Sequence, residues 1–159
     1  MSMNAESMTG LVRTSVLFAP PARVWAECVT LEGINRELGP LLSMTPPPPG
    51  VADTLDDVPV DAPWFRSEIL LLGRFPVDHD DLVIVELEPG RRFLERSSTR
   101  TQLVWEHERT VEPAPGGGTV LTDRVAWTPR AAPLIAGAPI FHAVFSWRHR
   151  QLRRRFGRL

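Results

Sequence analysis

The chain has 159 residues, 43% of them apolar and 23% charged, and this length fits a single domain. The balance is typical of a globular protein and excludes an intrinsically disordered one. The formal net charge is only −1, so no overall field attracts nucleic acid or an anionic membrane. All 18 basic residues are Arg, which excludes chemistry through a lysine Schiff base.

The single cysteine and the hydropathy of the chain indicate the cellular compartment in which the protein is expected. The single cysteine, Cys28, cannot form a disulfide within the chain, and this favours a reducing environment. The opening stretch MSMNAESMTG lacks the basic and apolar regions of a secretory signal. No apolar run reaches the roughly 18 residues that a membrane span needs. The sequence therefore predicts a cytoplasmic protein without a membrane span.

The N-terminal part is predicted to hold one strand and then helices. Residues 1–9 are polar and aperiodic, so we expect a disordered terminus followed by a single domain over residues 10–159. The segment Leu11–Phe18 is rich in β-branched residues and predicts a strand. Apolar residues at helical spacing follow Pro20-Pro21 and predict two short helices, or one bent helix, broken near Gly39-Pro40.

A β-rich region begins near Trp64. Turn-forming residues, including Pro76–Asp81 and Pro113–Gly118, separate its apolar runs. These connections are too short for helical crossovers, so we expect antiparallel hairpins. The predicted strands are Arg66–Arg74, Leu82–Glu88, Arg91–Ser97, Gln102–Val111 and Thr119–Thr128.

A long helix is predicted at the C-terminal end. Pro139 can open it, Phe141, Phe145 and Leu152 form an apolar stripe, and it ends near Phe156. Such a helix is about 27 Å long and can cross a small sheet. Because the sheet must bury one face, the sequence predicts an α+β domain of the helix-grip type. A curved antiparallel sheet of about six strands surrounds the long C-terminal helix, with two short helices after strand one.

A curved sheet around one helix commonly leaves a gap between them, and this gap is the basis of a ligand-binding hypothesis. Trp105, Trp127, Phe141 and Phe145 are the predicted lining, because aromatic rings offer large apolar area at little entropic cost. Plain core packing is an equally good interpretation of the same four residues.

His107 is a polar candidate in this lining. Strict alternation along Leu103–Val111 puts Leu103, Trp105, His107 and Arg109 on one face, which we assign to the inside of the sheet. A histidine facing a cavity can serve as a general base or as a hydrogen-bond donor to a ligand. The alternative is a structural histidine bonded to a neighbouring strand.

Two carboxylates complete the candidate site. Asp123 shares a strand face with apolar residues, and a buried carboxylate needs a partner. With His107 it would polarise a ligand carbonyl or move a proton; as a structural residue it would pair with an arginine. Glu95 is either a polar end of the cavity or a solvated residue on the outer face. The possible partners of Asp123 are His107, Arg109, Arg148 and His149.

Other chemistries find less support in the sequence. The four histidines are scattered and one cysteine cannot build a thiolate site, so neither a metal nor another cofactor is predicted. Asp78–Asp81 is dense in ligand atoms but falls in a predicted turn, where solvation explains it. The basic run Arg148–Arg158 suits a helix C-terminus, and no nucleic-acid motif accompanies it.

Three stretches carry a resemblance to a known family: SVLFAPPARVWAECV, the paired LVWEHERTVEP and TVLTDRVAWTP, and IFHAVFSWRHRQLRRRFG. They resemble the START-like, or SRPBCC, superfamily, and the last is similar to the family's Phe-x-x-Arg-His ending. More narrowly, the chain is similar to cell-division-inhibitor-like SRPBCC proteins. Family members often carry a second His at or two residues before the position of Arg109, and a Gly-Pro before that strand. Here Arg109 and Thr101-Gln102 stand instead.

The resemblance implies binding of hydrophobic molecules or metabolites. The predicted function is therefore binding of a small hydrophobic ligand, such as a polyketide, lipid or isoprenoid, by a monomer or homodimer without a nucleic-acid partner. The first alternative is a polyketide cyclase or dehydratase, with His107 as acid/base and Asp123 as its orienter. The second alternative is a protein-interaction module.

Overall fold

The computed structural model describes residues 9–131 and 137–158. The predicted disordered terminus therefore lies outside the described residues, apart from Thr9, which begins the first strand. The elements in chain order are β1 (Thr9–Leu17), α1 (Pro21–Cys28), α2 (Leu31–Leu38), β2 (Leu42–Met44), the 3₁₀ turn η2 (Leu55–Asp57), β3 (Pro63–Leu71), β4 (Phe75–Glu88), β5 (Arg92–Thr99), β6 (Gln102–Pro113), β7 (Thr119–Pro129) and α3 (Ala138–Phe156).

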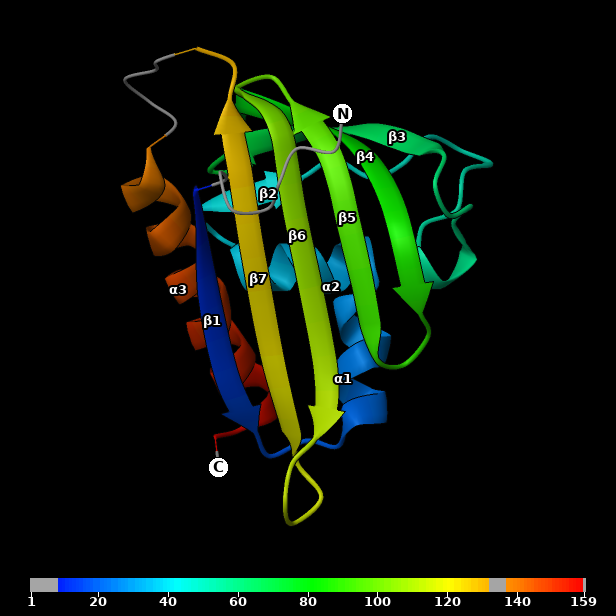
Figure 1. Cartoon of the computed structure of the whole chain (residues 1–159), viewed down its shortest axis with the longest axis vertical. Coiled ribbons are helices and arrows are strands. Elements are labelled where there is room, and N and C mark those ends of the chain that lie inside the picture. Colours follow the sequence, from blue (N-terminus) through cyan, green and yellow to red (C-terminus); the bar gives the residue numbers. More distant parts are fainter. Residues whose placement is uncertain (1–8, 132–136, 159) are drawn as a thin grey trace.

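The strands form a seven-stranded antiparallel sheet in the order β1-β7-β6-β5-β4-β3-β2. In Figure 1 the helices α1, α2 and α3 lie behind the sheet, on one face. This arrangement confirms the predicted helix-grip architecture with its two short helices and long final helix. The strand that the prediction lacked is β2, which at three residues is too short to show an alternation. None of the helices in the described part of the chain is long and apolar enough to cross a membrane.

The predicted turn at Pro76–Asp81 is wrong, because these residues belong to β4. The hairpin between β3 and β4 closes earlier, where Leu72 and Gly73 have positive φ angles of 54° and 68°. Gly73 adopts that conformation without steric cost. Pro76 then pairs with Leu70 inside the ladder. The proline and the three acids, whose composition suggests a turn, therefore belong to an extended strand.

The inward assignment of Leu103 is also wrong, since this side chain is 52% exposed. The pairing of β6 with β7 shifts register between Gln102 and Val104, and such a bulge reverses the parity of the residues before it. Gln102 therefore takes the inner face and is 1% exposed. From Trp105 onward the alternation runs as predicted.

Local signals fix the two short helices against each other. Pro21 stands in the first turn of α1, and the Thr30 side chain caps α2 by accepting a hydrogen bond from the Gly33 N–H at 3.0 Å. A Cβ at Gly33 would lie 1.7 Å from the Glu27 carbonyl oxygen, so only glycine permits this approach. One turn further along α2, Glu37 is buried.

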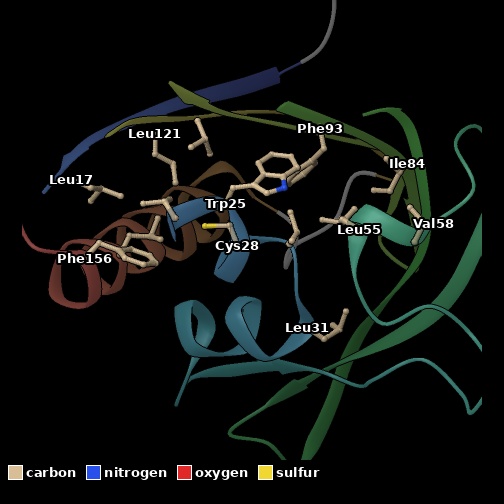
Figure 2. Packing of buried hydrophobic residues seen from close by; sticks show 14 of the residues in the cluster. Leu17, Trp25, Cys28, Leu31, Leu55, Val58, Ile84, Phe93, Leu121 and Phe156 are labelled. Carbon is tan, nitrogen blue, oxygen red and sulfur yellow. The ribbon is translucent and has the colours of Figure 1, made fainter. Parts of the chain in front are cut away.

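The core divides into two clusters. The larger one joins the sheet to α1 and to the C-terminal half of α3, and Figure 2 shows Trp25 of α1 beside Phe93 of β5, with ring centroids 6.4 Å apart. The smaller cluster lies under the N-terminal half of α3. Its members are Leu11, Val125, Trp127 and Phe145, with Trp105, Phe141 and Val144 packed against them.

Candidate functional site

A cavity of about 400 Å³ lies between the inner face of the sheet and the helices α2 and α3. That volume falls in the range of small-molecule sites, roughly 300–1,000 Å³. Most of its walls are apolar, since aliphatic and aromatic side chains come from both helices and from β3, β4 and β5. Typical wall residues are Leu31, Ile34, Trp64, Ile84 and Val144.

Three of the four aromatic residues singled out by the sequence line this cavity, namely Trp105, Phe141 and Phe145. Trp127 lies one layer behind them. Its ring is stacked on Trp105 with centroids 6.4 Å apart, and it meets Phe141 at 4.7 Å. The aromatic wall is therefore backed by a second ring, which holds Trp105 and Phe141 in place.

His107 also lines the cavity and is 5% exposed. Its ring stands edge-on to Phe93 and Phe145, with centroids at 5.4 and 5.2 Å. On its far side the Nε2 atom lies 2.7 Å from Asp123 Oδ1. The two predicted polar residues are thus in contact, with His107 between the cavity and the carboxylate.

Asp123 is fully buried and accepts several charged hydrogen bonds. Arg109 donates from Nε to Oδ1 at 2.7 Å and from Nη2 to Oδ2 at 2.8 Å, and His149 Nε2 lies 2.8 Å from Oδ2. Burial raises the pKa of Asp123, but Arg109 and then His107 outweigh it and hold that pKa well below its ordinary value. Because Asp123 is a carboxylate, both His107 and His149 donate to it through Nε2.

The network continues from Arg109 to α2 and α3. Arg109 donates to both carboxylate oxygens of Glu37, at 2.9 and 2.8 Å, and Arg148 Nε donates to Glu37 Oε1 at 3.1 Å. Burial opposes ionisation of Glu37, but Arg109 and Arg148 lower its pKa. Two carboxylates and two guanidinium groups thus balance in charge, and we call Glu37, Arg109, Asp123 and Arg148 the charge-balanced network.

His149 extends this network to the first strand. Its Nδ1 lies 2.7 Å from Ser15 Oγ, and Arg153 donates to the same hydroxyl at 3.0 Å. With Nε2 carrying the proton toward Asp123, Ser15 donates to Nδ1 and accepts from Arg153. The chain of hydrogen bonds ties α3 to β1 and leaves His149 away from the cavity lining.

A second polar group lies on the inner face of β4, β5 and β6. Glu95 is buried and lines the cavity, and Ser97 Oγ donates to its Oε2 at 2.7 Å. Asp80 is also buried there, so the interpretation of Asp78–Asp81 as a solvated turn is wrong. Burial first, and the neighbouring Glu95 second, raise the pKa of Asp80 well above its ordinary value. Gln102 lies at the same surface of the cavity.

The sequence analysis missed three of these buried polar residues. Glu37 follows Ile34 by three residues and so falls on the apolar stripe of α2, a signal that could have found it. Asp80 alternates with Leu82 and Ile84, which marks an inward position on a strand. Gln102 carried no such signal, because its inward orientation depends on the bulge.

The described residues also bear on two other kinds of site, a nucleophilic cysteine and a metal centre. Burial raises the pKa of the Cys28 thiol to about 12, so at neutral pH it is a thiol, not the nucleophilic thiolate. Over residues 9–131 and 137–158, no group of three or more His, Cys, Asp or Glu side chains is arranged to hold a metal ion.

The curved antiparallel sheet and the long helix that it grips define a protein of the helix-grip fold class. The chain is similar to protein CV1439 from Chromobacterium violaceum, with a TM-score of 0.70, 19% identity, and coverage of 93% of this chain and 97% of that one. A START superfamily protein from Mycobacterium smegmatis matches with a TM-score of 0.60 and 9% identity over 93% and 94% of the two chains. DynU16, a protein in the dynemicin biosynthetic locus, matches with a TM-score of 0.57 and 15% identity over 93% of this chain and 45% of that one.

At such identities these likenesses show the fold alone. No curated protein matches the sequence. A family model described as a domain of unknown function, DUF8410, matches residues 15–156. The chain therefore belongs to the DUF8410 family.

Proposed function

We propose that this protein binds a small hydrophobic molecule, of polyketide, lipid or isoprenoid type, in the cavity between the sheet and α3. The observation that supports this most directly is the cavity of about 400 Å³ with predominantly apolar walls. Trp105 and Phe145, the two side chains best placed to plug the interior, form part of its wall instead. Buried apolar surface that lacks a protein partner favours an apolar guest.

The entrance supports the same function. Leu71 on β3, Val77 on β4 and Ile140 on α3 line the cavity and are also 41%, 44% and 46% exposed. They place the opening between the β3–β4 hairpin and the start of α3. An apolar rim lets an apolar ligand pass from a carrier or membrane to the interior without crossing a charged surface.

The test uses native mass spectrometry of the purified protein, to detect a small molecule that co-purifies, and titration with the uncharged fluorescent probe N-phenyl-1-naphthylamine. Val144 lines the cavity from α3, so Val144→Trp should fill it and weaken probe binding at least about tenfold, or 1.4 kcal/mol. Val16→Trp is the matched control, because Val16 is 40% exposed on β1. Equal probe binding by both variants, each with a cooperative melt, would overturn the proposal.

A second candidate, an enzyme of the cyclase or dehydratase type, is favoured by the contact between His107 and Asp123 at 2.7 Å. Asp123 holds the proton of His107 on Nε2, which leaves Nδ1 as the nitrogen that can accept a proton from a substrate in the cavity. Arg109 fixes Asp123 in turn, so Asp123 would act as a positioning residue.

His107→Gln separates the two functions. A carrier should keep its affinity for the probe within about threefold, since only one lining group changes. An enzyme acting on a polyketide-type substrate should lose roughly 10²–10⁴ in kcat, the usual contribution of a general acid or base. A wild-type protein that binds such substrates and never converts them would rule out the enzyme.

A further inference from the structure

One end of the cavity is acidic and incompletely satisfied. Asp80, Glu95 and Gln102 line it, with exposures of 5%, 6% and 1%, and we call these three residues the acid end. Among the described residues, Asp80 Oδ1 and Gln102 Oε1 have no hydrogen-bond partner. A buried acceptor without a donor costs free energy, so native proteins seldom keep two together without a reason.

The acid end also lacks a counter-charge. No Arg or His in the described part of the chain forms an ion pair with Asp80 or Glu95. The two basic residues that line the cavity are engaged elsewhere: Arg148 donates to Glu37 and His107 to Asp123. Burial and Glu95, the latter through its charge and a hydrogen bond between the two carboxyl groups, raise the pKa of Asp80, as expected for two buried carboxyl groups with no cation beside them.

These features specify the chemistry of a complementary ligand. The two atoms without a partner, Asp80 Oδ1 and Gln102 Oε1, are both oxygens, so a ligand that brings donors would complete them. An anionic head would meet Glu95 and Asp80 with like charge, and a neutral hydroxyl would supply a single donor and no charge. A primary ammonium group supplies three donors and a positive charge. The remaining cavity walls are apolar and aromatic, and they suit an apolar body.

We propose that the ligand is a lipophilic amine, whose ammonium group is held by Asp80, Glu95 and Gln102 while its apolar body lies against Trp64, Trp105 and Phe145. This inference rests on the proposed function, since it names the ligand class for the same cavity. The ammonium group would supply hydrogen bonds to Asp80 Oδ1 and Gln102 Oε1. It would also compensate the charge that the protein leaves unbalanced.

The experiment compares three competitors of equal chain length, decylamine, 1-decanol and decanoic acid, by displacement of N-phenyl-1-naphthylamine at pH 7. Decylamine should bind at least about tenfold more tightly than 1-decanol, as expected for a charge-assisted hydrogen bond, and decanoic acid should bind most weakly. Asp80→Asn should reduce the affinity for decylamine about tenfold and leave that for 1-decanol within about threefold.

Asp81→Asn is the matched control, because Asp81 is the next residue of β4 and pairs with Arg66 at the surface. It should leave the order of the three competitors unchanged. Glu95→Gln gives a second test if Asp80→Asn lacks a cooperative melt. Decylamine that binds no better than 1-decanol would overturn this inference and leave the proposed function standing. Absence of saturable probe binding would overturn both.

Discussion

Two groups of buried acids lie between the sheet and its helices, and they differ in whether cations neutralise them. In the charge-balanced network, Asp123 and Glu37 are each paired with guanidinium groups, and their pKa values are lowered. At the acid end of the cavity, Asp80 and Glu95 face each other without a cation, and the pKa of Asp80 is raised. Carboxyl groups that are similarly buried are therefore stabilised as anions in the first group and destabilised as anions in the second.

Whether a buried acid has a cationic partner distinguishes a structural role from a functional one better than its burial does. A fully satisfied polar network ties elements together, and here it joins α2, α3 and β1 to β6 and β7. It also fixes the proton of His107 on Nε2. An unsatisfied group destabilises the empty protein and persists where a ligand completes it. Asp123, which the sequence marks as the more unusual residue, lies behind the cavity wall, whereas the unremarkable Asp80 lines the cavity.

The largest effect is expected from removing the centre of the charge-balanced network. Arg109→Met leaves Asp123 and much of Glu37 as buried, uncompensated carboxylates, and this should lower the free energy of unfolding by about 3–5 kcal/mol. Urea unfolding followed by far-UV circular dichroism measures the change. Arg96→Met is the matched control: Arg96 of β5 pairs with Glu106 of β6 on the outer face of the same sheet, and its loss should cost at most about 1 kcal/mol. A loss below 1 kcal/mol for Arg109→Met would show that the network is not what holds the helices.

At the acid end, removing a charged group should raise the free energy of unfolding instead of lowering it. Because the folded-state pKa of Asp80 is raised, the unfolded chain releases this proton at a lower pH than the folded protein does. The stability of the empty protein therefore falls as pH rises above about 4 and levels off above the folded-state pKa. Asp80→Asn removes this loss, so it should stabilise the empty protein by about 1–2 kcal/mol at pH 8 and by little near pH 4.

Urea midpoints of the wild type and Asp80→Asn across pH 4–8 test this difference. Asp123→Asn should instead lose a nearly constant amount of stability over this range, since the lowered pKa of Asp123 contributes stability above about pH 4 that is lost only as pH falls below that value. A stabilised Asp80→Asn with weaker amine binding would be a trade of stability for function. A destabilised Asp80→Asn at pH 8 would mean that the carboxyl group is satisfied within the protein.

The sequence was sufficient for the architecture and for naming His107 as one of four possible partners of Asp123. Order and periodicity placed α1, α2 and α3, and alternation from Trp105 onward placed His107 and Arg109 inside. Proximity of Asp123 followed because antiparallel neighbours on one face must meet, and Arg109 and Asp123 are directly opposed in the ladder.

The acid end was not predictable from the same signals, for two physical reasons. Residues Pro76–Asp81 have the composition of a turn, and only the tight turn at Gly73 reveals that they are extended. Gln102 faces inward because of a bulge, and a bulge depends on tertiary packing that no local periodicity records. The role of Glu37 was equally hidden, since its partners Arg109 and Arg148 are 72 and 111 residues away.

The smallest effect is expected at the far end of the network, where Ser15 connects His149 to Arg153. Ser15→Ala removes a buried hydroxyl that donates to His149 Nδ1, and this should cost about 1 kcal/mol of the free energy of unfolding. Thr14→Ala is the matched control, because Thr14 is exposed on the neighbouring position of β1 and should change stability by less than about 0.5 kcal/mol. Probe binding should stay unchanged in both variants, since His149 lies away from the cavity lining. If Ser15→Ala instead altered probe affinity, the charge-balanced network would be coupled to ligand binding, and the separation between the two acid groups would fail.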